Sequence, residues 1–275
     1  MNIEQSLHKE YKLKEILLEM ESVIIAFSGG VDSTYLLKVA LETLGKENVL
    51  AVTADSESFP ASELEETIRL AKQLQAPHQI IQMSELAIPG YKENDLNRCY
   101  FCKKGLFEKL YPVLIEKGFN NLIFGLIKDD LGEHRPGVKA AIENNVRGPL
   151  AEADITKEDI RIRSKELEID TWDKPSLACL SSRIAYGEKI TVEKLKRIDQ
   201  AEQYLKGLGI KQVRVRMHDE IARVEVEQAD MQLLLNHHEE ATRHLKSLHF
   251  KFVTMDLAGY KSGSMNSMLE KIGNK

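Results

Sequence analysis

A glycine-containing loop between an apolar run and a helical pattern constrains this chain most. The apolar run covers residues 23–27, residues 35–41 have a helical pattern, and the loop between them reads Ser28-Gly29-Gly30-Val31-Asp32-Ser33-Thr34. Adjacent glycines let backbone N–H groups approach a ligand closely, and the following helix directs the positive end of its dipole to the same point. The pattern predicts a phosphate site, with hydroxyl donors from the loop and Asp32 as a ligand for Mg²⁺.

The loop is not the Walker motif, Gly-x-x-x-x-Gly-Lys-Ser/Thr, because it has no lysine at the required place. It resembles instead the PP-loop, Ser-Gly-Gly-x-Asp-Ser, of ATP pyrophosphatases. That resemblance implies that the loop holds the β and γ phosphates of ATP while the α phosphorus is attacked, so that AMP is transferred and pyrophosphate leaves. Without a ligand, the same residues would form a glycine turn with an aspartate near the helix start.

The composition agrees with a nucleotide enzyme. The length of 275 residues allows one large domain or one domain with a smaller companion, and the hydrophobic content of 43% is enough for a core. The net charge of −5 argues against a general nucleic-acid-binding surface, which would be basic. The first ten residues have no apolar secretion segment, and no apolar run approaches the roughly 20 residues that span a bilayer. We therefore expect a cytoplasmic protein with reduced cysteines and no membrane partner.

Strand and helix patterns alternate in the first part of the chain. The expected strands are at 23–27, 49–54, 79–81 and 121–125, and the expected helices are at 35–41, 62–74 and 106–117. This alternation predicts a parallel sheet with right-handed crossovers, in which ligands bind at the carboxyl ends of the strands. We expect this PP-loop domain to cover residues 1–170.

The pattern changes in the last part of the chain. It gives a helix, two short strands, a mostly helical stretch and a final strand, at 192–207, 212–217, 221–226, 229–248 and 251–257. This order predicts a small α+β domain over 191–275, for substrate binding or oligomerisation. The polar stretch 171–190 is expected to be a functional loop that carries Cys179. The fold class is thus α/β, a parallel-sheet domain followed by a small α+β domain.

Three cysteines are the second chemical signal. Cys99 and Cys102 form a C-x-x-C pair just before a helical pattern, and Cys179 stands alone in the polar loop. Three thiolates are too few for a four-cysteine zinc site, but they can hold three irons of a 4Fe-4S cluster and leave the fourth iron open. The alternatives are zinc completed by a histidine, a redox dithiol, and cysteines that only pack as small apolar side chains.

Other charged residues follow the expected strands. Lys128 comes after the fourth strand, and Arg135 and Lys139 flank an expected helix start, where they could bind pyrophosphate. As isolated residues they would be solvated surface. Arg214 and Arg216 alternate along a strand and therefore point to one face, which implies an anionic ligand. The alternative is that both are exposed edge charges that discourage aggregation.

Segments along nearly the whole chain resemble the LarE family of sulfur transferases. These segments are residues 26–34, 124–130, 135–139, 181–187, 213–218, 221–225 and 256–263. LarE proteins are similar to NAD and GMP synthetases in their first domain, and they build the nickel-pincer nucleotide cofactor of lactate racemase. The resemblance implies that ATP adenylates a carboxylate of pyridinium-3,5-biscarboxylic acid mononucleotide and that sulfur displaces AMP to leave a thiocarboxylate. It also implies a homo-oligomer, a trimer or a hexamer.

The patterns and the resemblance together assign the site residues. The ATP-binding positions are Ala26, Ser28, Gly29, Gly30, Asp32, Ser33, Thr34, Ala54, Gly125, Arg135 and Lys139. The substrate-binding positions are Ser182, Arg183, Glu202, Arg214 and Arg216. The catalytic positions are Cys179, Asp32, Lys128 and Arg183. The metal ligands are Cys99, Cys102 and Cys179 for the cluster, and Asp32 for Mg²⁺.

The cysteines differ from those of the sacrificial LarE type. In that type, one cysteine a few residues before a Ser-Ser-Arg sequence gives up its own sulfur; the matching position here is Ala178, beside Cys179. The sacrificial type also lacks the C-x-x-C pair. The three cysteines resemble cluster-dependent LarE proteins and tRNA thiolation enzymes of the TtuA type, so we expect the open iron to bind sulfide from an external source. Sacrificial donation by Cys179 is the alternative.

Three other functions share parts of this pattern. An amidating synthetase would deliver ammonia to the same adenylate, but the chain begins Met1-Asn2 and offers neither an N-terminal cysteine nucleophile nor room for a glutaminase domain. A tRNA thiolase is disfavoured by the acidic charge balance and by the missing zinc-finger or THUMP-like extension. A nucleotide or redox sensor is the third. We expect a small-molecule nucleotide and a sulfide source as partners, rather than nucleic acid.

Overall fold

The fold is described from a computed structural model that covers residues 3–131, 136–175, 178–261 and 263–265. The chain divides into two compact units. The first comprises Met1–Ile88 and Cys99–Leu177, and the second comprises Pro89–Arg98 and Ala178–Lys275. The second unit thus takes in a short segment, 89–98, that a division along the sequence assigns to the first domain; the functional domains expected above remain a prediction.

A four-stranded parallel sheet forms the centre of the first unit. Its strands are β1 (Val23–Ala26), β2 (Val49–Asp55), β3 (His78–Gln82) and β4 (Asn121–Phe124), in the order β3-β2-β1-β4. The β1 strand and most of β2 and β4 are apolar, as expected for strands that are covered by helices on both faces, whereas the edge strand β3 is partly polar. The expected α/β fold class is confirmed, and β1, which carries the glycine loop, lies in the interior of the sheet.

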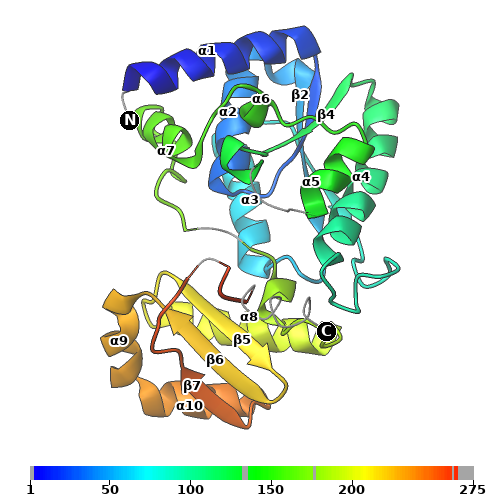
Figure 1. Cartoon of the computed structure of the whole chain (residues 1–275). Helices are drawn as coiled ribbons and strands as arrows, with labels where there is room; N and C mark the ends of the chain where they lie inside the picture. The colour runs from blue at the N-terminus through cyan, green and yellow to red at the C-terminus, as the bar shows by residue number, and fades with distance from the viewer. Residues whose placement is uncertain (1–2, 132–135, 176–177, 262, 266–275) are drawn as a thin grey trace. The chain divides into compact units, whose positions relative to one another are not determined.

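Helices lie on both faces of this sheet (Figure 1). The first face carries α1 (Ile3–Met20), α2 (Val31–Leu44), α3 (Ala61–Gln73), α6 (Pro149–Glu152) and α7 (Lys157–Glu166). The second face carries α4 (Arg98–Lys117) and α5 (Pro136–Glu143). The short turns η1 (Lys46–Asn48) and η2 (Lys128–Asp130) complete the unit. Because α4 begins at Arg98, well before the expected residue 106, the C-x-x-C pair lies in its first two turns.

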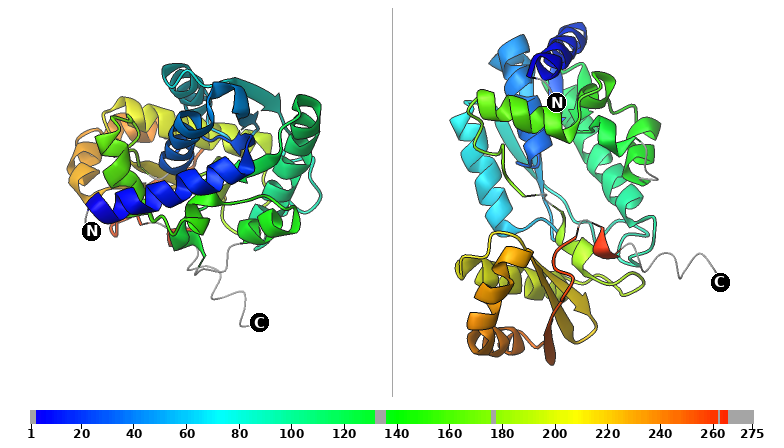
Figure 2. Two further views of the ribbon diagram at one scale, coloured as in Figure 1. Left: turned by 90° about the horizontal axis from the view of Figure 1, so that it is seen from above. Right: turned by 60° about the vertical axis from the view of Figure 1, so that its left-hand side comes forward.

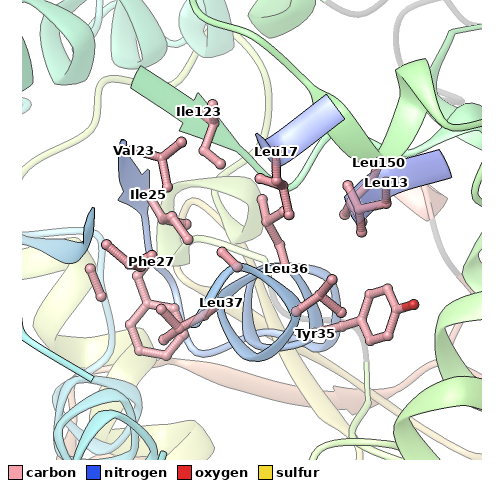
Figure 3. Packing of buried hydrophobic residues seen from close by; sticks show 14 of the residues in the cluster. Leu13, Leu17, Val23, Ile25, Phe27, Tyr35, Leu36, Leu37, Ile123 and Leu150 are labelled. Carbon is pink, nitrogen blue, oxygen red and sulfur yellow. The ribbon is translucent and has the colours of Figure 1, made fainter. Parts of the chain in front are cut away.

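Successive side chains of β1 point to opposite faces of the sheet, and the core of the first unit therefore has two layers. Val23 and Ile25 are fully buried in the cluster that includes α1 and α2, and Figure 3 shows them beside Leu17 and Leu36. Ile24 points to the other face and belongs to the cluster of α4 and α5. Burying each such side chain contributes about 1.5–3 kcal/mol. The packing on both faces fixes β1, and so fixes where the loop after it begins.

Buried polar contacts fasten α1 to α7, which lie side by side in Figure 2. The Asp159 carboxylate accepts hydrogen bonds from the Ser6 hydroxyl at 2.7 Å and from Lys9 Nζ at 2.6 Å. It also accepts one from the Thr156 amide at 2.9 Å, in a capping box that starts α7. These contacts set the position of the first residue of α7, Lys157.

The second unit contains a three-stranded sheet packed against helices. Its strands are β5 (Val213–His218), β6 (Ile221–Val226) and β7 (Phe252–Met255), with β5 and β6 antiparallel and β6 and β7 parallel. Its helices and turns are η3 (Leu180–Arg183), α8 (Val192–Gly207), η4 (Gln228–Asp230), α9 (Met231–Asn236) and α10 (His238–Ser247). This confirms the expected small α+β fold. Across the described parts of both units, no helix is long and apolar enough to cross a membrane.

The cluster around Asp159 predicts a loss of stability in acid. Burial alone would raise the pKa of Asp159, but hydrogen bonds from Lys9, Thr156 and Ser6 together lower it to about 2. Because the folded pKa lies below the unfolded one, this stabilisation is complete above about pH 5 and disappears as the pH falls towards 2. We expect Asp159→Asn to lower the free energy of unfolding by about 2 kcal/mol near neutral pH.

Urea unfolding across this pH range measures the effect. The difference between wild type and Asp159→Asn should shrink steadily below about pH 5, where the wild type loses the advantage of its carboxylate. Asp154→Asn is the control, because Asp154 makes its ion pairs with Lys12 and Lys128 on the exposed surface. A difference between wild type and Asp159→Asn that stays constant with pH would contradict the assignment.

Candidate functional site

The glycine loop joins the end of β1 to the start of α2. The Phe27 amide donates to Val52 O at 2.9 Å, which keeps the loop aligned with β2 as it leaves the sheet. Gly30 is the N-cap residue of α2 and has no side chain to cap the helix. No side chain of this residue therefore caps the N–H groups in the first turn of α2. Such N–H groups at a helix N-terminus can bind an anion.

Two glycines allow the surrounding elements to approach the loop. Gly29 has φ +65°, and a Cβ placed there would lie 2.6 Å from Cγ2 of Thr67 on α3. Gly125 directly follows β4, and a Cβ there would lie 3.1 Å from the Ser33 amide nitrogen and 3.2 Å from Asp32 Cβ. The loop is thus enclosed by α3 and by the end of β4, and both positions require glycine for lack of space.

Hydroxyl groups of the loop lie close together. Ser28 Oγ and Ser33 Oγ are 3.2 Å apart, and Ser33 Oγ also accepts from the Ser28 amide at 3.3 Å. Thr34 Oγ1 donates to Gly30 O at 2.8 Å. Of the other residues expected here, Ala26 ends β1 and Ala54 lies in β2, two residues beyond the pairing partner of Ala26. The structure therefore gathers the expected loop residues around one short stretch of backbone.

Asp32 forms a close ion pair that the sequence did not reveal. Lys157 Nζ lies 2.6 and 2.7 Å from the two Asp32 carboxylate oxygens. Burial raises the pKa of Asp32, and the charge and hydrogen bond of Lys157 oppose that rise. Lys157 is the first residue of α7, and the Thr156-x-x-Asp159 capping box was the available sequence signal for a helix start there.

Two expected phosphate-binding lysines have acidic partners of their own. Lys128 Nζ lies 2.8 Å from Asp154 Oδ1, and this pair is about half exposed. Lys139 Nζ lies 3.8 Å from Glu143 and 5.8 Å from the centre of the Tyr100 ring. Neither contact involves the glycine loop. Arg135 lies outside the described residues.

The C-x-x-C pair lies in the first two turns of α4. Cys99 and Cys102 are three residues apart on a helix and therefore share a face. Cys99 is exposed, and Cys102 Sγ donates to Oε1 of the buried Glu85 at 2.9 Å. Within the part of the chain that the structure describes, no three His, Cys, Asp or Glu side chains are grouped closely enough to hold a metal ion.

Cys179 stands at the N-cap of η3 in the second unit. The Arg183 guanidinium donates to Cys179 O at 2.9 Å and to Ala178 O at 2.6 Å. It also makes two hydrogen bonds to the Glu202 carboxylate, at 2.9 and 3.0 Å. Ser182 Oγ donates to Cys179 O at 2.8 Å. A buried ion pair thus holds the backbone of the cysteine turn.

Arginines gather on one face of the small sheet. Arg216 Nε donates to Glu225 at 3.0 Å, and Arg216 Nη1 donates to Ser182 O at 3.2 Å. The Arg214 guanidinium carbon lies 5.4 Å from the centre of the Tyr260 ring. Both arginines are buried, so neither is an exposed edge charge. Burial, and then repulsion from Arg183, lower the pKa of Arg214, as expected where cations are crowded.

Comparisons with known proteins agree with both units. The NAD synthase family model matches residues 4–94, which include the glycine loop and the first three strands. A pyridinium-3,5-bisthiocarboxylic acid mononucleotide synthase of Lactiplantibacillus plantarum is 38% identical over 263 residues, 96% of this chain and 95% of that protein. The chain belongs to the LarE family.

Two further relatives also match the LarE-family chain along most of its length. An uncharacterized protein of Synechocystis sp. is 43% identical and covers 94% of this chain and 97% of its own. An uncharacterized protein of Methanocaldococcus jannaschii is 32% identical and covers 93% of this chain and 98% of its own. The expected LarE resemblance is confirmed, and it includes the small α+β unit as well as the parallel-sheet unit.

The contact at Gly29 predicts a strong effect of adding one methyl group. Gly29→Ala should destabilise the protein by about 2 kcal/mol or more, because it combines a positive φ with a clash against Thr67. Gly118→Ala is the matched control, since Gly118 has φ +71° but open space around it. Urea unfolding measures the loss of stability, and the double variant Gly29→Ala/Thr67→Ser should be more stable than Gly29→Ala alone. Equal losses of stability in Gly29→Ala and Gly118→Ala would rule out the clash.

The ion pair at Asp32 predicts a change in its titration. Lys157→Met should raise the pKa of Asp32 further, because burial would then act without the opposing lysine. Carboxyl ¹³C NMR measures this directly. Lys128→Met is the control: it should raise the pKa of Asp154, which a hydrogen bond from Lys128 lowers, and leave Asp32 unchanged. An Asp32 titration that is the same in Lys157→Met and wild type would contradict the coupling.

Proposed function

We propose that the chain is an ATP-dependent sulfur transferase that converts carboxylates of pyridinium-3,5-biscarboxylic acid mononucleotide to thiocarboxylates. The observation that carries this proposal is the near full-length similarity to a synthase named for the bisthiocarboxylic acid mononucleotide. The glycine loop at the end of β1 supports the ATP-dependent half of the reaction. The arginine face of the small sheet supports binding of an anionic nucleotide.

The first step is activation of a carboxylate. A substrate carboxylate oxygen attacks the α phosphorus of ATP, the bond between the α phosphorus and the bridging oxygen breaks, and pyrophosphate leaves. Loop N–H groups and hydroxyls would bind the leaving phosphates, and Asp32 would hold Mg²⁺, which would supply positive charge where negative charge builds. Lys157 Nζ lies 2.6 Å from the Asp32 carboxylate and would keep this partly buried acid charged and oriented.

The second step replaces oxygen by sulfur. A carboxylate is a poor electrophile, whereas the acyl adenylate offers AMP as a good leaving group. A sulfide electron pair forms the new carbon–sulfur bond, and the carbon–oxygen bond to AMP breaks. Holding the substrate in place removes much of the orientational cost of this attack. Ser182, Arg183, Arg214 and Arg216 would bind the phosphate and second carboxylate, with Glu202 fixing Arg183.

Cys99, Cys102 and Cys179 would hold a 4Fe-4S cluster. The first two share a face of α4, as two ligands of one cluster require. Arg98, the residue before Cys99, donates to Ser181 O at 3.0 Å, and Ser181 stands two residues after Cys179. Arg98 and Ser181 both belong to the second unit. The cluster would supply a bound, deprotonated sulfide; without it, Cys179 would be the sulfur donor.

Several finer assignments belong to this proposal. Lys128 would act on the leaving pyrophosphate only after releasing Asp154, and Lys139 only after releasing Glu143. Arg135 would join them at the same phosphates. A homo-oligomer, a trimer or a hexamer, remains the expected assembly. Transfer of sulfur to tRNA and transfer of ammonia to the same adenylate are the competing reactions.

Product analysis tests the proposed function. We expect anaerobically purified protein to form AMP and a thiocarboxylate, detected by mass spectrometry, from ATP, sulfide and the pyridinium mononucleotide, but not from tRNA. Asp32→Ala should abolish substrate-dependent pyrophosphate release. A product containing amide nitrogen, or AMP formation only with tRNA, would contradict the proposal.

The cysteine variants separate the two sulfur sources. With a cluster, Ser at Cys99, Cys102 or Cys179 should remove iron and thiolation together while pyrophosphate release continues, because adenylation uses other residues. With a sacrificial donor, only Cys179→Ser should stop transfer, and the intact mass of the used chain should fall once, by one H₂S. Persistent pyrophosphate release serves as the control for folding in every variant.

A further inference from the structure

A short segment at the end of the described first unit is fastened to α7. We call residues 171–175 the strap. Arg161 on α7 donates from its two terminal nitrogens to Trp172 O and to Lys174 O, each at 3.0 Å. Lys165, one turn further along α7, places its Nζ 4.8 Å from the centre of the Trp172 ring. The backbone of the strap is therefore held on both sides of residue 173.

One side chain connects the strap to the glycine loop. Lys174 Nζ lies 3.1 Å from Gly29 O and 2.9 Å from Glu63 Oε2 on α3. The Lys174 and Glu63 side chains are only 17% and 15% exposed, so the contact is shielded from solvent. Lys174 Nζ adds positive charge beside a loop that would bind phosphate, and its hydrogen bond to the Gly29 carbonyl also fixes the orientation of that peptide.

The orientation follows from peptide geometry. The described chain contains no cis peptide bond, so the Gly29 carbonyl and the Gly30 N–H point in opposite directions from one planar unit. An ammonium that holds the carbonyl on one side directs the N–H to the other. Gly30 is the N-cap residue of α2, where N–H groups meet an anion. Lys174 thus fixes the direction of a donor that it does not itself touch.

The same helix also contacts the other part of the loop. Lys157 and Arg161 are four residues apart on α7 and share a face, so one face reaches Asp32 and the strap. Phosphate and metal entering the loop must change the partners of Asp32 and of the Gly29–Gly30 peptide. Both changes act on groups that are anchored to α7 and the strap.

We propose that Lys174 is a positioning residue that orients the Gly29–Gly30 peptide for the nucleotide phosphates and transmits occupancy of the loop to the strap. In the sequence, Cys179 follows Lys174 by five residues, so the segment that carries this cysteine is covalently linked to the strap. The inference rests on the ATP-binding half of the proposed function. It does not depend on the identity of the carboxylate substrate or of the sulfur source.

The chain contains a natural probe for this coupling. Trp172 is its one tryptophan and lies in the strap, with 38% of its side chain exposed. In the intact protein, saturating Mg²⁺ and α,β-methylene-ATP, which cannot release pyrophosphate, should shift the Trp172 emission. Lys174→Met should bind the analogue about tenfold more weakly, the loss of one charge-assisted contact, and show no shift at saturation.

Matched variants separate the effect of orienting the Gly29–Gly30 peptide from the effect of the Lys174 charge. Lys174→Arg keeps a cationic donor and should restore most of the shift. Glu63→Gln loosens Lys174 without removing its charge and should reduce the shift. Lys72→Met removes an exposed lysine from α3 and should leave affinity and emission unchanged. Calorimetry gives the saturation of each variant, and circular dichroism confirms its fold.

Two results would overturn the inference. One is a wild-type protein that binds the analogue by calorimetry without any change in Trp172 emission. The other is a Lys174→Met protein that shows the full wild-type shift at saturation. A failed product assay with an intact Trp172 response would instead reject the proposed substrate chemistry and leave the coupling in place, so the two failures are distinguishable.

Discussion

Lack of space around the glycine loop is the constraint on which the rest of the first unit depends. A loop that binds phosphate must expose backbone N–H groups, yet the sheet and helices that position it must pack closely. Gly29 and Gly125 resolve this conflict, because the Thr67 methyl and the start of α2 occupy the places where their side chains would be. With both faces of β1 buried, the loop has one direction in which to open, beyond the carboxyl ends of the strands.

Buried charges in this protein are arranged for orientation more than for stability. Removing an ion pair from water costs about as much as the pair regains, so Asp32–Lys157 and Arg183–Glu202 contribute little net free energy. Each instead fixes a group at a chosen place. Lys157 holds a carboxylate that burial would otherwise protonate more easily, and Glu202 holds a guanidinium that grips the cysteine turn. Breaking Arg183–Glu202 would leave an uncompensated buried charge, and breaking Asp32–Lys157 would leave a partly buried one.

The fold and the loop could be predicted from the sequence because their signals are local. The strands β1, β2, β3 and β4 appear as short apolar runs, and the loop between β1 and α2 is contiguous. The partners of the loop could not be predicted in this way. Lys157 and Lys174 lie more than a hundred residues from the loop atoms they contact, and nothing in their neighbours indicates which carboxylate or carbonyl they meet.

The start of α4 shows the same limit at shorter range. Residues 98–105 lack a strong apolar periodicity, so the helix was expected to begin at 106, although the C-x-x-C pair was already visible. The contact from Cys102 to Glu85 and that from Arg98 to Ser181 depend on tertiary structure. Local pattern gives the type of chemistry, and long-range contacts give its geometry.

The structure shows a physical role for the arginine of the Ser-Ser-Arg motif that the sequence alone did not indicate. Arg183 uses most of its N–H groups on Glu202 and on the carbonyls of Ala178 and Cys179, so its main task within the second unit is to hold the cysteine turn. An anion that bound Arg183 would have to compete with these partners. Arg214 packs on a tyrosine ring and donates to its neighbour's carbonyl, Val213 O. The two arginines therefore differ in setting: Arg183 is committed to the backbone of the cysteine turn, and Arg214 is presented from β5 against the face of a ring.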